Sequence, residues 1–171
     1  NSETECGEVE MEFEFDASNL GGQDIVVFEK LYYEDNLILE HSDINDDNQT
    51  LSFLFLRTFA TNRSTKKKML PLNKEVEIVD EVSYCLKTDI EYTLEAVIMD
   101  KSTGDKLLVD DAPVEDELTF TPEECCGQVE MSFTLNTKDL AGAELVIFEN
   151  LYQDEQLVLE HNNLYNVDQT V

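Results

Sequence analysis

Residues 6–13 read Cys6-Gly7-Glu8-Val9-Glu10-Met11-Glu12-Phe13, and residues 126–133 return as Cys126-Gly127-Gln128-Val129-Glu130-Met131-Ser132-Phe133. In both stretches, apolar side chains alternate with polar ones. A period of two is typical of a β-strand that buries one face and exposes the other to water. The pattern therefore predicts a β-protein, and its return after 120 residues predicts an internal repeat.

The same offset extends well beyond these two stretches. Aligned without gaps, residues 1–51 and 121–171 share 20 identities. A period of 120 residues is the size of a whole domain rather than of a solenoid unit. We therefore expect a tandem repeat. Residues 1–51 are the C-terminal part of one repeat, whose opening half is missing, and residues 52–171 are a nearly complete second repeat. The complement of 1–51 is expected upstream or on a neighbouring chain.

Other short segments are rich in β-branched or aromatic residues and end at turn residues, which predicts further strands. These segments are 25–28, 37–39, 51–56, 76–79, 92–99, 145–148 and 157–159. Residues 102–105, Ser-Thr-Gly-Asp, predict a hairpin turn between two of the strands. Many short strands with little helical periodicity predict an all-β fold, an immunoglobulin-like antiparallel β-sandwich.

Composition limits the function. The 171 residues include 39 Asp and Glu against 11 Lys and Arg, which gives a formal net charge of −28. Such a chain repels nucleic acid and anionic lipid at long range, so neither is expected as a partner. No window approaches the roughly 18 consecutive apolar residues of a membrane helix, so we expect no membrane insertion in this segment. The basic run 66–68 is interpreted as a charged turn.

Both histidines of the chain stand at equivalent repeat positions, His41 and His161. Each is followed eight residues later by a glutamine, Gln49 or Gln169. Histidine and a primary amide at a fixed spacing in both copies make these positions candidates for a shared site.

Two kinds of carboxylate belong to apolar runs. Glu29 and Glu149 each lie twelve residues before a histidine and follow a phenylalanine. Strand alternation requires that either the phenylalanine or the glutamate points inward. Asp80 shares a strand face with Val76 and Ile78, so it belongs to the apolar face and must be partnered or protonated there.

The combination of motifs resembles the VaFE repeats of Gram-positive surface adhesins and pili, immunoglobulin-like domains that form an intramolecular Thr–Gln ester cross-link. The resemblance covers essentially all of 56–171 and again 6–51. The motifs are Val-Val-Phe-Glu-x-Leu-Tyr at 26–32 and Val-Ile-Phe-Glu-x-Leu-Tyr at 146–152, His-x7-Gln-Thr at 41–50 and 161–170, Ile-Val-Asp-x-Val-x-Tyr at 78–84, Ile-Met-Asp-Lys-x-Thr-Gly at 98–104 and Thr-x-Ala-Thr at 58–61.

The resemblance implies a role for each matching residue. Thr58 is the nucleophile and Gln169 the electrophile of the cross-link, and Asp80, Glu149 and His161 assist. A threonine hydroxyl needs a base and a primary amide needs polarisation before they react. Asp80 takes the Thr58 proton, directly or through a proton shared with Glu149, while His161 polarises the amide or orients Glu149. Ammonia leaves in a single event without turnover, so no enzyme activity, cofactor or metal is expected.

Thr61 competes with Thr58 for the role of nucleophile. Thr58 shares the apolar face with Leu56 and Ala60, which favours Thr58. In the first repeat, Glu29, His41 and Gln49 match the same roles, but their threonine and aspartate would precede Asn1. A rival interpretation is that the acidic cluster is merely a structural hydrogen-bonded group.

At the level of function, the resemblance implies a structural stalk or fibre module of an extracellular, cell-wall-anchored surface protein. Its partners would be neighbouring repeats of the same polypeptide or fibre, with a host-surface ligand bound through a separate tip domain. The alternative is an immunoglobulin-like adhesin domain that binds a ligand and forms no cross-link.

The four cysteines predict a disulfide. Cys6 and Cys126 are repeat equivalents, and Cys125 has no counterpart. In an extracellular protein, a bond between Cys85 and Cys126 is expected, which leaves Cys6 to an upstream partner. Adjacent cysteines lack the usual two-residue spacing of a zinc site.

Overall fold

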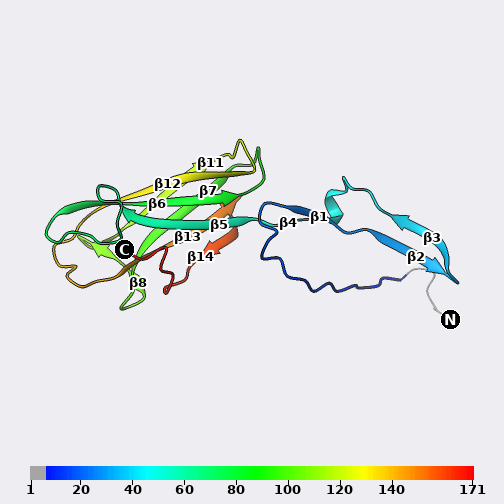
Figure 1. Ribbon diagram of the computed structural model, residues 1–171, viewed down its shortest axis with the longest axis horizontal. Coiled ribbons are helices and arrows are strands. Elements are labelled where there is room, and N and C mark those ends of the chain that lie inside the picture. Colours follow the sequence, from blue (N-terminus) through cyan, green and yellow to red (C-terminus); the bar gives the residue numbers. More distant parts are fainter. Residues whose placement is uncertain (1–6) are drawn as a thin grey trace.

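Two strands of eleven residues pair in the first sheet, and apolar and polar side chains largely alternate along each of them. They are β6 (Glu75–Cys85) and β12 (Cys126–Asn136). β5 (Phe55–Asn62) pairs with the other edge of β6, so the antiparallel order is β12-β6-β5. The computed structural model describes residues 7–171, and this sheet belongs to a sandwich built from residues 55–171 (Figure 1).

The second sheet has the antiparallel order β11-β7-β13-β14. Its strands are β11 (Glu115–Phe120), β7 (Tyr92–Asp100), β13 (Leu145–Gln153) and β14 (Gln156–His161). The short β8 (Asp105–Lys106) pairs with β7 across the predicted hairpin turn, where Gly104 takes a φ of +76°. β9 (Leu108–Val109) and β10 (Ala112–Pro113) form a separate small hairpin.

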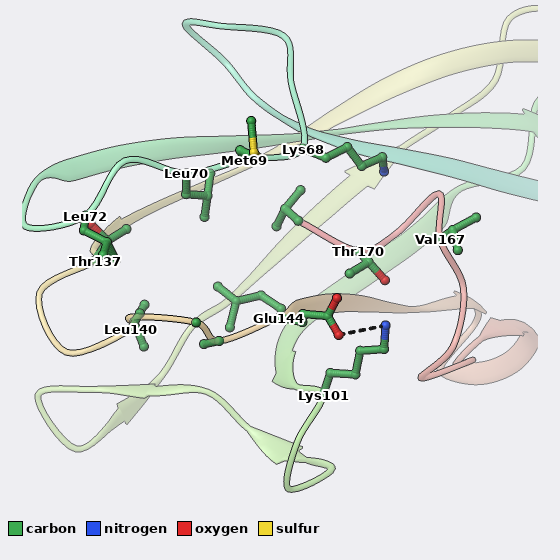
Figure 2. Close-up of a pocket in the computed structure, with 14 residues that line it drawn as sticks. Lys68, Met69, Leu70, Leu72, Lys101, Thr137, Leu140, Glu144, Val167 and Thr170 are labelled. Atoms are coloured by element: carbon green, nitrogen blue, oxygen red, sulfur yellow. Dashed lines mark ion pairs between the residues drawn. The ribbon is translucent and has the colours of Figure 1, made fainter.

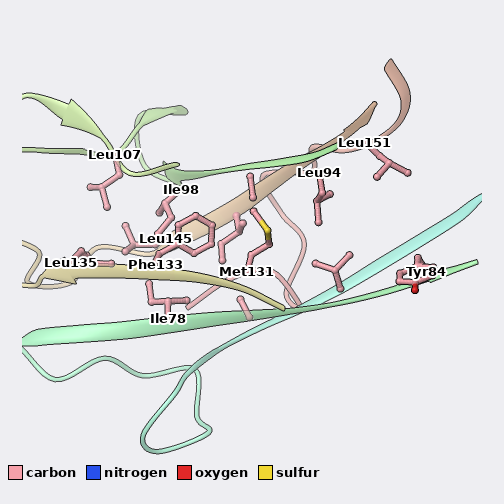
Figure 3. Packing of buried hydrophobic residues seen from close by; sticks show 14 of the residues in the cluster. Ile78, Tyr84, Leu94, Ile98, Leu107, Met131, Phe133, Leu135, Leu145 and Leu151 are labelled. Carbon is pink, nitrogen blue, oxygen red and sulfur yellow. The ribbon is translucent and has the colours of Figure 1, made fainter. Parts of the chain in front are cut away.

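The inward faces of both sheets form one apolar core (Figure 3). Ile78 and Val82 of β6, Leu94 and Ile98 of β7, and Leu151 of β13 have no exposed surface. Burial of such side chains is the main contribution to the stability of a sandwich. The predicted all-β, immunoglobulin-like antiparallel sandwich is confirmed.

Residues 7–53 form an extension with two small sheets and no shared core with the sandwich (Figure 1). β1 (Asp24–Val26) pairs with β4 (Thr50–Ser52), and β2 (Glu29–Tyr33) pairs with β3 (Asn36–His41). A single 3-10 turn, η1 (Asp47–Gln49), precedes β4. No helix among residues 7–171 is long and apolar enough to cross a membrane.

Two local predictions are wrong. The alternating stretch 9–15 forms no hydrogen-bonded strand, although its counterpart 129–135 lies in β12. A strand needs a neighbour for its backbone groups, and the described chain places none beside residues 9–15. The predicted strand 51–56 is divided between β4 and β5, because the chain crosses from the extension to the sandwich at residues 53–54.

Candidate functional site

The first sheet contributes a hydroxyl and a carboxyl to the inside of the sandwich. Ala60 of β5 lies directly opposite Asp80 of β6, so these residues and Thr58 share the inward face. Thr58 is 1% exposed and Asp80 is fully buried. Thr61 lies opposite Val79, so it belongs to the other face of the sheet, although it is also buried. The geometry thus places Thr58, rather than Thr61, on the face that bears Asp80.

The second sheet contributes the other carboxyl and the amide. Glu149 lies within β13 between Ala96 of β7 and His161 of β14, and it is fully buried. Gln169 follows β14 on a segment that returns to β13, where its carbonyl accepts a hydrogen bond of 3.2 Å from the Ile147 N–H. The Gln169 side chain is also fully buried.

The amide of Gln169 binds directly to Glu149. Its Nε2 donates to Glu149 Oε2 and to the backbone carbonyl of His161, the latter at 3.2 Å. The hydroxyl of Thr58 is near enough to Glu149 to act against the rise in the pKa of that carboxyl, although Thr58 Oγ1 makes no hydrogen bond among the described residues. Hydroxyl, amide and carboxyl therefore converge on one point between the sheets.

Burial determines the charge of the two carboxyls. Desolvation raises the pKa of Glu149 to about 11, and the adjacent Asp80 adds to the rise. Desolvation also raises the pKa of Asp80, against an interaction with Glu149 and the charge of Lys68 that lower it. Both Asp80 oxygens and Glu149 Oε1 lack a hydrogen-bond donor among the described residues. A single proton shared by the two carboxyls supplies the missing hydrogen bond and removes one buried charge.

His161 lies beside this pair in its neutral form, because burial lowers its pKa. Its Nε2 is 2.8 Å from the Asn166 side-chain nitrogen, which can only donate, so the ring proton is on Nδ1. That Nδ1 lies 3.5 Å from Glu149 Oε2. The His161 ring therefore lies beside Glu149, and neither His161 Nδ1 nor Gln169 Oε1 has a hydrogen-bond partner among the described residues.

A comparison with protein families accounts for this set of residues. The model described as "T-Q ester bond containing domain" matches residues 1–53 and 55–171. The chain belongs to this family. The resemblance drawn from the sequence is confirmed at this level, because the family's description names a T-Q ester bond.

Solved structures agree on the fold. A bacterial adhesin from Mobiluncus mulieris containing intramolecular disulfide, isopeptide and ester bond cross-links is similar in two crystal forms, with TM-scores of 0.55 and 0.54 at 15% and 14% identity. The match covers 69% of this chain and 56% of the adhesin chain. A glycosyl hydrolase family 2 member from Bacteroides cellulosilyticus matches at a TM-score of 0.50 and 15% identity, over 66% of this chain and 15% of that one. No curated protein matches the chain.

Residues 7–53 contain a second, partial copy of the ester bond site. Gln49 Nε2 donates to Glu29 Oε2 at 2.8 Å, and His41 Nδ1 lies 3.7 Å from the same oxygen. The arrangement matches that of Gln169, Glu149 and His161. However, the Glu29 and His41 side chains are 44% and 50% exposed. The aspartate that contacts His41, Asp46 at 2.8 Å from Nε2, stands at the repeat position of Asn166 and not of Asp80.

A disulfide closes one end of the first sheet. Cys85 and Cys126 are directly opposite in the β6–β12 pairing, and their sulfurs are 2.13 Å apart. Cys125 is exposed and free. Cys6 lies outside the described residues. Within residues 7–171, no group of three or more His, Cys, Asp or Glu side chains is arranged to hold a metal ion.

Sequence reasoning missed two neighbours of the site, Asn166 and Lys68. Asn166 fixes the tautomer of His161, and Lys68 reaches the backbone next to Gln169. The only sequence signal for Lys68 was its place in a basic run within an acidic chain, and that run did not identify which lysine is used.

A cavity of about 550 Å³ lies next to the C-terminal segment (Figure 2). It is lined by Lys68, Leu70, Leu140, Val167 and Val171, among others, and contains the Lys101–Glu144 ion pair. Thr58, Asp80, Glu149 and Gln169 are not among its lining residues. The reactive group is thus enclosed between the sheets, separate from this cavity.

Proposed function

We propose that residues 55–171 form a module of a surface adhesin that is locked by an ester bond between Thr58 Oγ1 and Gln169 Cδ. The observation that supports it is the burial of one hydroxyl, one primary amide and two neighbouring carboxyls between the sheets. Membership of the ester bond family agrees with this reading. The assignment of the two cross-linked residues is our own.

The reaction balances with the groups present. Thr58 Oγ1 attacks Gln169 Cδ, and its proton passes to Asp80. The Cδ–Nε2 bond breaks, and Nε2 takes a proton from Glu149, whose Oε2 it already contacts. Ammonia leaves, and the pair of carboxyls again holds one proton. His161 orients Glu149 through Nδ1. Because the four side chains are buried, bulk water does not reach the amide and hydrolysis does not compete.

The cross-link would join the first strand of the sandwich to the segment that follows its last strand. It closes a covalent loop between residues 58 and 169, so tension on the chain cannot separate the two ends. In the chain-entropy model, a loop of this length stabilises the fold by roughly 4 to 5 kcal/mol. This suits a stalk or fibre module of a Gram-positive cell surface, in a cell-wall-anchored protein or pilus.

We also infer that residues 1–51 belong to a preceding repeat of the same kind. The support is the shared arrangement of Glu29, His41 and Gln49 and the exposed apolar side chains around it. A segment equivalent to residues 55–120 would cover these side chains and supply the missing threonine and aspartate. Neighbouring repeats are therefore the proposed partners, and a host ligand would bind through a separate tip domain.

The test is the intact mass of the chain under denaturing, reducing conditions. The expected result is a deficit of about 17 Da, the mass of ammonia, that is absent in Thr58→Ala. Thr61→Ala is the matched control and should keep the deficit. An unmodified mass after prolonged incubation of the folded protein would leave the alternative, a ligand-binding adhesin domain without a cross-link, with the cavity beside Val167 as its candidate site.

A further inference from the structure

The basic run 66–68 folds back over β5. The Asn62 side-chain carbonyl accepts hydrogen bonds from the Ser64 and Thr65 N–H groups at 3.0 and 2.9 Å, which turns the chain at the end of the strand. The return path leaves Lys66 and Lys67 exposed but makes Lys68 half-buried. One lysine of the three is thus directed toward the sandwich.

Lys68 contacts residues that are next to Gln169 and next to Thr58 in the chain. Its Nζ donates to the Asp168 carbonyl, which also accepts from the Ala60 N–H at 3.0 Å. Asp168 directly precedes Gln169, and Ala60 lies two residues after Thr58. The same ammonium lies 4.3 Å from the centre of the Phe59 ring, which holds it over β5. Figure 2 shows the side chain reaching toward the segment that bears Val167 and Thr170.

We propose that Lys68 is a positioning residue for the cross-linking reaction, a role that rests on the proposed function. It holds the Asp168–Gln169 peptide against the strand of Thr58, and its charge makes Asp80, rather than Glu149, the ionised member of the pair. Asp80 is then the base that accepts the threonine proton, and Glu149 retains the proton that the leaving nitrogen needs.

The surrounding charges agree with this assignment. Burial raises the pKa of Asp80 overall, and the charge of Lys68 opposes that rise. Burial lowers the pKa of Lys68 overall, and the charges of Asp168 and Asp80 oppose that change. The pKa of Glu149, the other member of the pair, is raised. The nearby Arg57 forms an ion pair with the Asp168 carboxylate at 3.4 Å. Lys68 is therefore the one cation acting on Asp80 among the described residues.

The experiment follows the rate of ammonia loss in refolding chains. Chains of the full 171 residues are purified unfolded in denaturant, diluted into buffers from pH 5 to 9, and sampled by intact mass. The variants are Lys68→Met, which keeps the aliphatic stem without the charge, Lys68→Arg, which restores it, and the exposed neighbour Lys67→Met as a control. Circular dichroism establishes that each variant has refolded.

In Lys68→Met, the bond should form about tenfold more slowly at pH 7, and the rise of rate with pH should move to higher pH by about one unit, because Asp80 ionises less readily without the cation. Lys68→Arg should recover most of the rate, and Lys67→Met should match the original chain.

Two results would overturn the proposal. One is an unchanged rate profile in Lys68→Met, and the other is an equal slowing at every pH with no shift, which a purely structural role would give. If Lys68→Met does not refold, the neutral Lys68→Gln takes its place, and an unchanged rate profile in that variant overturns the charge role. If the original chain never loses 17 Da, the cross-link itself fails, and that outcome is distinct because it precedes any variant.

Discussion

The hairpins β2–β3 and β13–β14 are nearly the same piece of chain in two environments. Glu29 pairs with His41 and Glu149 with His161, and each hairpin has a register shift at the same place. Yet Leu31 is 58% exposed and Leu151 is fully buried. Local sequence is thus sufficient to form the hairpin and to bring the glutamate, histidine and glutamine together. The facing sheet adds the burial, and with it the altered protonation of Glu149.

The largest expected difference between the two hairpins concerns the glutamate. Glu149→Gln removes the proton donor for the leaving nitrogen, so the expected result is no ester and no mass deficit over days. Glu29→Gln changes the same position in the open hairpin and should leave the deficit of about 17 Da intact. Intact mass of the two variants decides the matter. A mass deficit retained in Glu149→Gln would show that Asp80 alone accepts the threonine proton and protonates the leaving nitrogen.

Truncation of a phenylalanine should also have different effects on the free energy of unfolding at the two equivalent repeat positions. Phe133 is 2% exposed in the sandwich, whereas its counterpart Phe13 is 63% exposed. Phe133→Ala should lower the free energy of unfolding by roughly 3 to 5 kcal/mol, because it leaves a cavity. Phe13→Ala should change it by less than about 0.5 kcal/mol. Urea unfolding of the Thr58→Ala background, which lacks the covalent loop, measures both. Equal effects would mean that residues 7–16 are packed in solution.

Stability against pH sharpens the comparison further. The pKa of Glu149 is raised to about 11, so the folded state keeps a proton that the unfolded chain releases above its ordinary pKa of 4.5. This contribution is complete below about pH 4.5 and is lost as pH rises toward 11, by up to about 1.4 kcal/mol per pH unit. Urea unfolding of Thr58→Ala between pH 5 and 9 should show this decline.

Matched variants test whether the loss of stability with pH comes from Asp80 and Glu149. Adding Asp80→Asn and Glu149→Gln to Thr58→Ala should flatten the profile, because no carboxyl remains at the site to hold the proton. Adding Glu29→Gln instead should leave the slope unchanged. A slope that survives removal of both buried carboxyls would assign it to other groups.

The same comparison shows what a sequence can predict. The alternation of 129–133 and of 76–80 predicted strands and placed Asp80 on the apolar face, because strand geometry fixes which side chains share a face. The identical alternation at 9–15 failed, because pairing depends on a partner that local pattern does not encode. Lys68 was missed for a similar reason, since the turn at Asn62, and not composition, decides which lysine folds back.

The smallest expected difference concerns two equivalent turns. Gly22 and Gly142 have φ values of +76° and +77°, where a side chain is strained. A Cβ on Gly22 would lie 2.7 Å from the Cys85 Cβ at the disulfide, whereas a Cβ on Gly142 would meet nothing within 4 Å. Gly142→Ala should therefore cost only the backbone strain, about 1 kcal/mol, measured by unfolding of the sandwich.

Gly22→Ala should leave that unfolding unchanged but separate the extension from the disulfide edge, so proteases should cleave near Leu54 faster. If cleavage is equally slow in both variants, the close approach of Gly22 to Cys85 does not hold the extension against the sandwich.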